Sequence, residues 1–266
     1  MNIKFENAEQ NLLIAIVMLL LVAVLGPLVL QPVHQHDFAD QRFIGYFPNA
    51  ADVLSNLPFA LWGLAGFMTL QVVKLNRTIL GLSALFFFGL IVTAFASSWY
   101  HLELNNAGLM IDRLGMTVAF AGLLGLAAAD RASLRAGVIL SVLTLALGSL
   151  SVWVWSLSGN VLPWLVLQFG GMALVLWFAT HPPLQGTHGP LAVRWGVVIL
   201  IYAFAKVFEL VDHAVYDFTA HIISGHSLKH IIASFAAWPV ISAIKQGRIL
   251  SLTRIEHITT KLGDAA

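Results

Sequence analysis

Long apolar runs constrain the fold of this chain more than any other feature of its sequence. Each run is about 20 residues long, the length that an α-helix needs to cross a hydrocarbon core of ~30 Å. A β-barrel would use alternating segments of about 10 residues, so helices are preferred. The sequence therefore predicts an all-α, polytopic membrane helical bundle. The eight predicted helices cover residues 12–30, 51–73, 79–98, 106–129, 134–156, 160–180, 191–212 and 222–243.

Composition excludes several other classes of protein. Apolar residues make up 59% of the 266 residues and charged residues only 10%, which does not describe a soluble globule. The formal net charge is +1 and no basic stripe is present, so nucleic acid is excluded as a partner. The chain contains no Cys, so any metal must be bound by His and carboxylate side chains.

Basic residues predict the orientation, because cytoplasmic loops of membrane proteins retain an excess of Lys and Arg. With the N-terminus inside, the cytoplasmic side holds ten of the 14 Lys and Arg residues: Lys4, Lys74, Arg77, Arg131, Arg135, Arg194, Lys245, Arg248, Arg254 and Lys261. Arg42 lies in an outer loop. An even number of helices places both termini in the cytoplasm, and the first helix, 12–30, is expected to be retained because no small-residue cleavage site follows it.

Five polar residues interrupt the apolar runs at one predicted depth. Ser97 and His101 end an outward-running helix, Asp112 begins the next helix, and His226 and His230 begin the last one. Ionisable side chains at membrane depth are costly, so a group that converges indicates a functional site. All five are expected in the outer half of the membrane.

The types and spacing of these residues indicate a catalytic metal site. Ser97 with His101, and His226 with His230, are i,i+4 pairs that share a helix face. Three His ligands leave a fourth position for water, as in catalytic zinc sites, where the ion lowers the pKa of that water to about 7. Asp112 is then the expected proton shuttle, and Ser97 the expected hydrogen-bond donor to an oxyanion.

These motifs resemble the alkaline ceramidase family, in the superfamily of seven-helix membrane hydrolases that includes the progestin and adipoQ receptors. The matching elements are Ser-x-x-x-His at Ser97 and His101, the single Asp112, and His-x-x-x-His at His226 and His230. The resemblance implies zinc on the three His and hydrolysis of a linear lipid amide, such as ceramide, to a free fatty acid and an amine lipid. The predicted partner is thus a lipid from the bilayer, and no protein partner is predicted.

The resemblance covers residues 37–243 and divides the chain into three parts. Residues 1–36 form an added N-terminal transmembrane helix and outer loop, residues 37–243 a seven-helix catalytic core, and residues 244–266 a basic cytoplasmic tail. The family also binds calcium near its N-terminus. The residues of this chain that correspond to that second metal site are Asp37, Asp40, Asn49 and Asp52, although their register departs from the family pattern.

Several alternatives remain open at this stage. Glu209 and Asp212 are either groups that orient the His ligands or a polar pair at a helix end. Lys229 could suggest a Schiff-base lysine, but its side chain points away from its neighbours on the helix, which turns by about 100° per residue. A bis-His haem protein would have no use for Ser97 and Asp112. A lipid receptor or transporter on the same core is the alternative function, and release of fatty acid from N-acyl lipids would exclude it.

Overall fold

The computed structural model describes residues 7–183 and 191–246, and within these ranges the chain is helical, with only isolated β-bridges. The predicted all-α membrane bundle is confirmed. Its helices are α1 (Asn7–Leu25), α2 (Ala50–Leu54), α3 (Leu57–Gln71), α4 (Arg77–Leu102), α5 (Asn106–Arg131), α6 (Leu134–Ser158), α7 (Leu162–Ala179), α8 (Trp195–Leu210), α9 (Asp212–Phe218) and α10 (Gly225–Ser234). Residues 247–266 of the predicted tail, with three of its basic residues, and Lys4 lie outside the described ranges.

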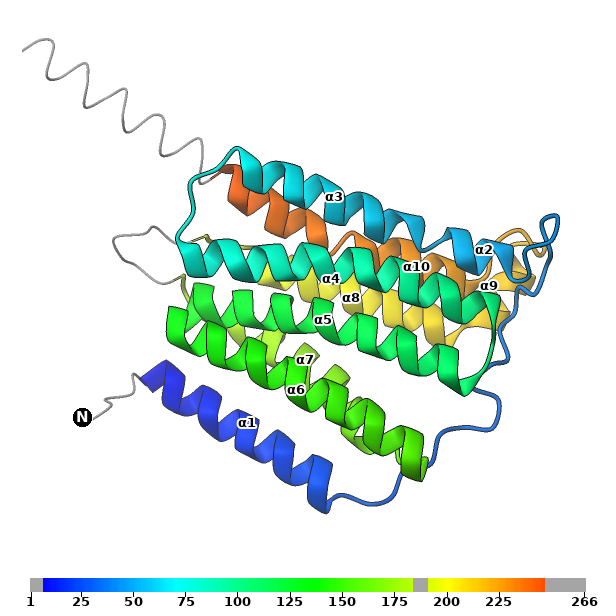
Figure 1. Ribbon diagram of the computed structural model, residues 1–266, viewed down its shortest axis with the longest axis horizontal. Helices are drawn as coiled ribbons and strands as arrows, with labels where there is room; N and C mark the ends of the chain where they lie inside the picture. Colours follow the sequence, from blue (N-terminus) through cyan, green and yellow to red (C-terminus); the bar gives the residue numbers. More distant parts are fainter. Residues whose placement is uncertain (1–6, 184–190, 247–266) are drawn as a thin grey trace, which may run out of the picture.

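The long helices run side by side in one bundle. Figure 1 shows α1 at one edge and α3 at the opposite edge, with α4, α5 and α6 between them. The start of α1 and the end of the described chain lie at the same end of the bundle, whereas α2 and α9 lie at the other end. This arrangement agrees with an even number of passes along the bundle.

Seven helical segments in the described ranges are long and apolar enough to cross a membrane. Two of them are composite. One, Ala50–Gln71, contains α2 and α3, and the other, Gly225–Gln246, contains α10 and its continuation. The predicted helix 191–212 is not among these seven and forms the shorter α8, whose 16 residues span about 24 Å at 1.5 Å per residue.

A buried carboxylate explains why α8 starts later than predicted. Asp130, at the end of α5, accepts hydrogen bonds from the backbone N–H groups of Ala192 and Val193 at 3.0 and 3.2 Å. It also accepts one from the indole of Trp195 at 2.8 Å. These bonds hold residues 192–193 outside the helix. The apolar run therefore predicted that α8 exists, but placed its start too early in the sequence.

The helix predicted over 51–73 is broken near Ser55 and Asn56. Pro58 has no backbone N–H and lies in the first turn of α3, where it can begin a helix but not continue one. The Ser55 hydroxyl and the Asn56 amide instead donate to the carbonyl oxygen of Asp52, at 2.8 and 2.9 Å. The break lies directly after Asp52, a residue that matters for the site below.

Helices α4 and α5 pack closely through small residues. A Cβ atom at Gly89 would lie 2.3 Å from the backbone nitrogen of Ala119, and one at Gly122 would lie 2.2 Å from that of Phe86. Such contacts are how membrane helices approach each other without a hydrophobic driving force. Helix α4 also extends to Leu102, beyond the predicted 98, so that His101 lies within a regular helix.

The added helix α1 is attached to the bundle through its first turn. Glu9 accepts hydrogen bonds from Ser133 at 2.5 Å and from Arg135 at 2.5 Å. A cavity of about 380 Å³ separates α1 from α6 and α7, and no ionisable side chain lines it. This part of the molecule offers apolar surface and no group that could take part in a reaction.

Candidate metal centre

Three histidines from two helices meet at the end of the bundle where α2 lies. The predicted ligands His101, His226 and His230 are all buried, and one nitrogen of each lies within 4.8 Å of the others. The Nε2 atoms of His101 and His226 are 3.2 Å apart. No other group of three His, Asp or Glu side chains in the described ranges could hold one metal ion. The structure therefore brings together the three ligands that the spacing predicted.

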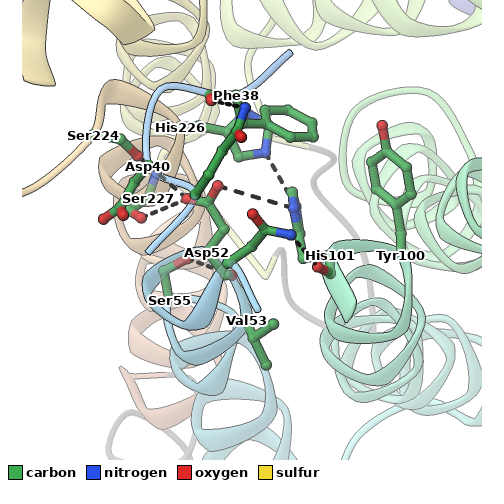
Figure 2. A network of polar contacts seen from close by, with 12 residues as sticks. Phe38, Asp40, Asp52, Val53, Ser55, Tyr100, His101, Ser224, His226 and Ser227 are labelled. Carbon is green, nitrogen blue, oxygen red and sulfur yellow. Dashed lines mark hydrogen bonds and ion pairs between the residues drawn. The ribbon is translucent and has the colours of Figure 1, made fainter. Parts of the chain in front are cut away.

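His101 is held from α2 and from the segment before it. The Asn49 amide donates to the carbonyl oxygen of His101 at 2.9 Å. The Oδ2 atom of Asp52 lies 4.0 Å from the Nδ1 atom of His101 (Figure 2), and neither atom has a hydrogen-bonding partner among the described residues. A small shift of the ring would let Nδ1–H donate to this carboxylate. Nε2 would then face the other two imidazoles.

His226 is positioned through its backbone. Ser224 caps α10 by accepting from the N–H of Ser227 at 2.9 Å, and the N–H of His226 donates to Asp212 at 2.7 Å. A Cβ at Gly225 would lie 2.3 Å from the carbonyl oxygen of Phe208, so only glycine allows this close approach. Asp212 therefore holds the backbone of His226 in place through this bond. It does not hydrogen-bond to the imidazole ring of His226.

The tautomer of His230 follows from its neighbour. Its Nδ1 atom lies 2.8 Å from the Ser55 hydroxyl, which itself donates to the carbonyl oxygen of Asp52. Because the hydroxyl proton is used there, Nδ1–H of His230 must be the donor, which leaves Nε2 unprotonated and free to bind a metal.

Asp52 was assigned to the second metal site by the resemblance. Its side chain is fully buried beside the triad. Its Oδ1 atom accepts from Ser227 at 2.6 Å and from Ser224 at 3.3 Å (Figure 2). The Asp52/Ser55 pair, three residues apart at the start of a broken helix, is the signal that sequence reasoning missed.

The predicted calcium ligands do not gather around one point. Asp40 forms an ion pair with Arg42 at 2.6 Å, Asp52 faces the triad, and Asp37 is exposed. These three carboxylates form no group close enough for one ion. Calcium binding through Asp37, Asp40, Asn49 and Asp52 stays a prediction. In this structure Asn49 and Asp52 lie against the triad residue His101.

The Asp40–Arg42 pair fixes the loop that covers the site. Burial raises the pKa of Asp40, but the hydrogen bonds and charge of Arg42 outweigh burial and hold the pKa below its usual value. Arg42 also donates to the carbonyl oxygen of Ile222 at 2.9 Å. Between these anchors, the ring of Phe38 packs against His226 with a centroid distance of 4.2 Å and so shields the triad from the outer side.

Ser97 and Asp112 line a cavity that reaches the triad at His230. The cavity has a volume of about 90 Å³, and most of its wall is apolar, including Phe59, Phe86 and other side chains. The Ser97 side chain interacts with the carboxyl group of Asp112. Asp112 is partly buried and also lines a larger outer cavity of about 750 Å³. The two predicted catalytic residues thus lie where the inner and outer cavities meet.

A second charged cluster lies on this side of the triad, and the sequence did not predict it as a unit. Glu209 pairs with both Lys206 and Lys229, the latter at 3.0 Å. The ammonium group of Lys229 also lies 3.2 Å from Nε2 of His226. The side chain of Lys229 reaches back along α10, so its angular separation from the histidines does not keep it from the site.

The residues present fit a divalent metal. Three imidazoles converge with ring nitrogens close to one another, and a buried carboxylate lies beside one of them, as in metal sites where a carboxylate orients a histidine ligand. The unpaired atoms of His101 and Asp52 are also explained if a metal ion draws the His101 ring into place. This buried three-histidine group could therefore hold a metal ion.

Comparison with known proteins does not name a family. A scan against protein-family models gives no match, and a search of curated proteins gives no relative. The resemblance to alkaline ceramidases therefore stays a prediction, and the function must be argued from the site.

Proposed function

We propose that this protein is a zinc-dependent membrane hydrolase that cleaves the amide bond of a ceramide-like N-acyl lipid. The observation that carries the proposal is the position of the triad. His101, His226 and His230 converge, and His230 lines a largely apolar cavity whose wall also includes Ser97 and Asp112. A lipid amide needs this combination of an apolar channel and a polar reaction centre.

Zinc is the metal that this ligand set favours, since imidazole ligands without thiolate suit a site with one open position. A zinc ion bound there lowers the pKa of a water molecule to about 7 and polarises a carbonyl group. The residues of the chain would provide the remaining chemistry.

Asp112 is the proposed proton carrier. Its carboxylate would take a proton from the attacking water and return it to the amide nitrogen, so that the C–N bond breaks and the products are a carboxylic acid and an amine. The Ser97 hydroxyl, beside Asp112, would donate a hydrogen bond to the carbonyl oxygen as negative charge develops on it. Both side chains line the inner cavity together with His230.

The apolar wall of the inner cavity is the proposed site of the acyl chain. Phe59, Phe86 and Leu90 line it, and none of their side chains offers a hydrogen bond. Burial of alkyl groups contributes about 0.8 kcal/mol per methylene, which would favour long acyl chains.

Fatty-acid release tests the proposal directly. The zinc-loaded protein in detergent micelles is supplied with C16 ceramide and a panel of other N-acyl lipids, and free fatty acid is measured by mass spectrometry. We expect release that stops after chelation and returns with zinc. Binding of these lipids without any release would contradict hydrolysis and favour the receptor or transporter alternative.

We further propose that both ends of the chain are cytoplasmic and that the triad lies in the outer half of the membrane. A reagent that reaches only the outer side should modify a cysteine introduced as Asn105→Cys, in the loop after α4. Ser133→Cys, at the opposite end between α5 and α6, should stay protected. The reverse labelling pattern would place the triad on the cytoplasmic half.

A further inference from the structure

We propose that the lipid substrate carries an acidic group next to its amide, and that Lys206 and Lys229 bind this group. The inference rests on the proposed hydrolase function and adds a substrate class to it, namely N-acyl amino acids. A neutral ceramide would not need the charged groups that line this part of the cavity.

The two lysines form an unusual arrangement for membrane depth. Their ammonium groups contact different oxygens of one carboxylate, that of Glu209, so this carboxylate is shared by two cations. The side chains of Lys206 and Lys229 are only 18% and 19% exposed. Charged groups at this depth are costly and usually mark a binding or transport site.

Each lysine has donor capacity left over. An ammonium group has three N–H donors. Lys206 uses one on Glu209 and has a long contact of 3.4 Å with Gln168. Lys229 uses one on Glu209, and its other contact is Nε2 of His226. A metal ion bound to that nitrogen would take this acceptor away, so Lys229 needs another partner when the triad is loaded.

A third cation faces the same outer cavity. Arg113 is buried against Trp155, 4.2 Å from the ring centroid, and donates to Gln31 at 2.9 Å. Its Nη1 atom has no hydrogen-bonding partner among the described residues. Arg113, Lys206 and Lys229 all line this cavity of about 750 Å³.

The acidic side chains of the cavity do not cancel this arrangement. Asp212 is already bonded to the backbone N–H groups of His226 and Ala39, at 2.7 and 3.0 Å. Asp37 is exposed at the rim. Glu209 already accepts from both lysines, and Asp112 is the proposed proton carrier. The N–H donors that remain on Lys206 and on Nη1 of Arg113 are therefore available to an acidic ligand.

The chemistry of an N-acyl amino acid fits this layout. Its carboxylate is separated from the amide nitrogen by one carbon atom, so the amide can lie at the triad while the carboxylate contacts Lys206 and Lys229. The acyl chain then enters the apolar inner cavity, which begins at the same residues. A site with such donors discriminates against an analogue that lacks the acceptor.

Binding to zinc-free protein tests this without turnover. The probes are N-palmitoylglycine, which carries a carboxylate, and N-palmitoylethanolamine, which carries a hydroxymethyl group in its place. Free palmitate is the third ligand. After chelation, we expect N-palmitoylglycine to bind at least about tenfold more tightly than the ethanolamide, as a charge-assisted hydrogen bond would give. Equal affinity for these two would overturn the proposal.

Matched variants locate the effect. Lys206→Met, which touches no metal ligand, should reduce the preference for the acid to within a few-fold, while Lys206→Arg should keep most of it. Lys74→Met, in an exposed loop between α3 and α4, is the control and should change nothing. An unchanged preference in Lys206→Met would overturn the assignment. If palmitate binds as tightly as N-palmitoylglycine and depends on Lys206 equally, the site binds product and the substrate claim is wrong.

Turnover separates this proposal from the hydrolase proposal. Both N-palmitoyl probes release the same fatty acid, so a higher kcat/KM for N-palmitoylglycine cannot come from the product. Faster release from the ethanolamide or from ceramide would overturn the acidic-substrate claim while hydrolysis stands. No release from any lipid would contradict hydrolysis, and the substrate claim would fall with it.

Discussion

The two sides of the histidine triad differ in whether their polar side chains reach a cavity. On the closed side, Asp52, Ser55 and Ser227 are buried, are bonded to one another or to His230, and line neither of the two cavities beside the triad. On the open side, Asp112 and Lys229 line both cavities. Under the proposed function, holding a metal and handling a substrate are then separate tasks. Variants on each side should therefore change different measurements.

Removal of a ligand should abolish both tasks and give the largest effect. In His226→Ala or His230→Ala, two imidazoles remain, which is too few for tight zinc binding. We expect most of the zinc to be lost and fatty-acid release to fall to background. Elemental analysis of the purified protein measures the first and mass spectrometry the second. Full stoichiometric zinc in either variant would contradict the ligand assignment.

On the open side, Asp112→Asn should separate turnover from metal content. The amide keeps the size of the side chain but cannot accept a proton. Because general acid–base catalysis contributes about 10²- to 10⁴-fold, kcat should fall by that order while zinc content stays near that of the wild type. Loss of zinc would make Asp112 a ligand. Activity within a few-fold of wild type would mean that another group, such as Glu209, moves the proton.

The sequence predicted the open side better than the closed side. Apolar run lengths and i,i+4 spacing predicted the bundle, the ligands, and the neighbourhood of Ser97 and Asp112, because helix periodicity fixes which residues share a face. The break between α2 and α3 follows from Pro58 and from side chains bonding to the Asp52 carbonyl, which periodicity does not report. Asp52 lies just before this break with its side chain buried beside His101, whereas the resemblance placed it in a calcium site.

The length of the lysine side chain explains why the sequence did not predict Lys229 at the site. The direction of a Cβ atom predicted that Lys229 points away from its neighbours, but four methylene groups let the ammonium group reach His226. Spacing along a helix therefore predicts the positions of short ligands such as His better than those of Lys.

On the closed side, Asp52→Asn should weaken metal binding rather than chemistry. The carboxylate lies 4.0 Å from Nδ1 of His101, and loss of its charge removes the acceptor that would orient this ring. Residues that orient metal ligands typically contribute 10- to 100-fold in affinity, and we expect that loss in a competition titration with a zinc chelator. At saturating zinc, kcat should stay within a few-fold. Ser234→Ala is the control, because this buried serine lies on the same helix as His226 and His230 and its hydroxyl donates to the carbonyl oxygen of Ile231, so the affinity should not change.

The smallest effect is expected from the covering loop, which belongs to neither side. Arg42→Gln removes the partner of Asp40 and a hydrogen bond to Ile222, and should lower the free energy of unfolding by about 1 kcal/mol near pH 7. The pKa of Asp40 is lowered in the folded protein, so the pair stabilises it above the unfolded pKa of about 3.9, and this stabilisation is lost as pH falls through the folded value. Thermal unfolding of wild type and variant should therefore differ at pH 7, and the difference should shrink below pH 4. A difference that does not change with pH would mean that the hydrogen bond to Ile222, and not the ion pair, holds the loop over the triad.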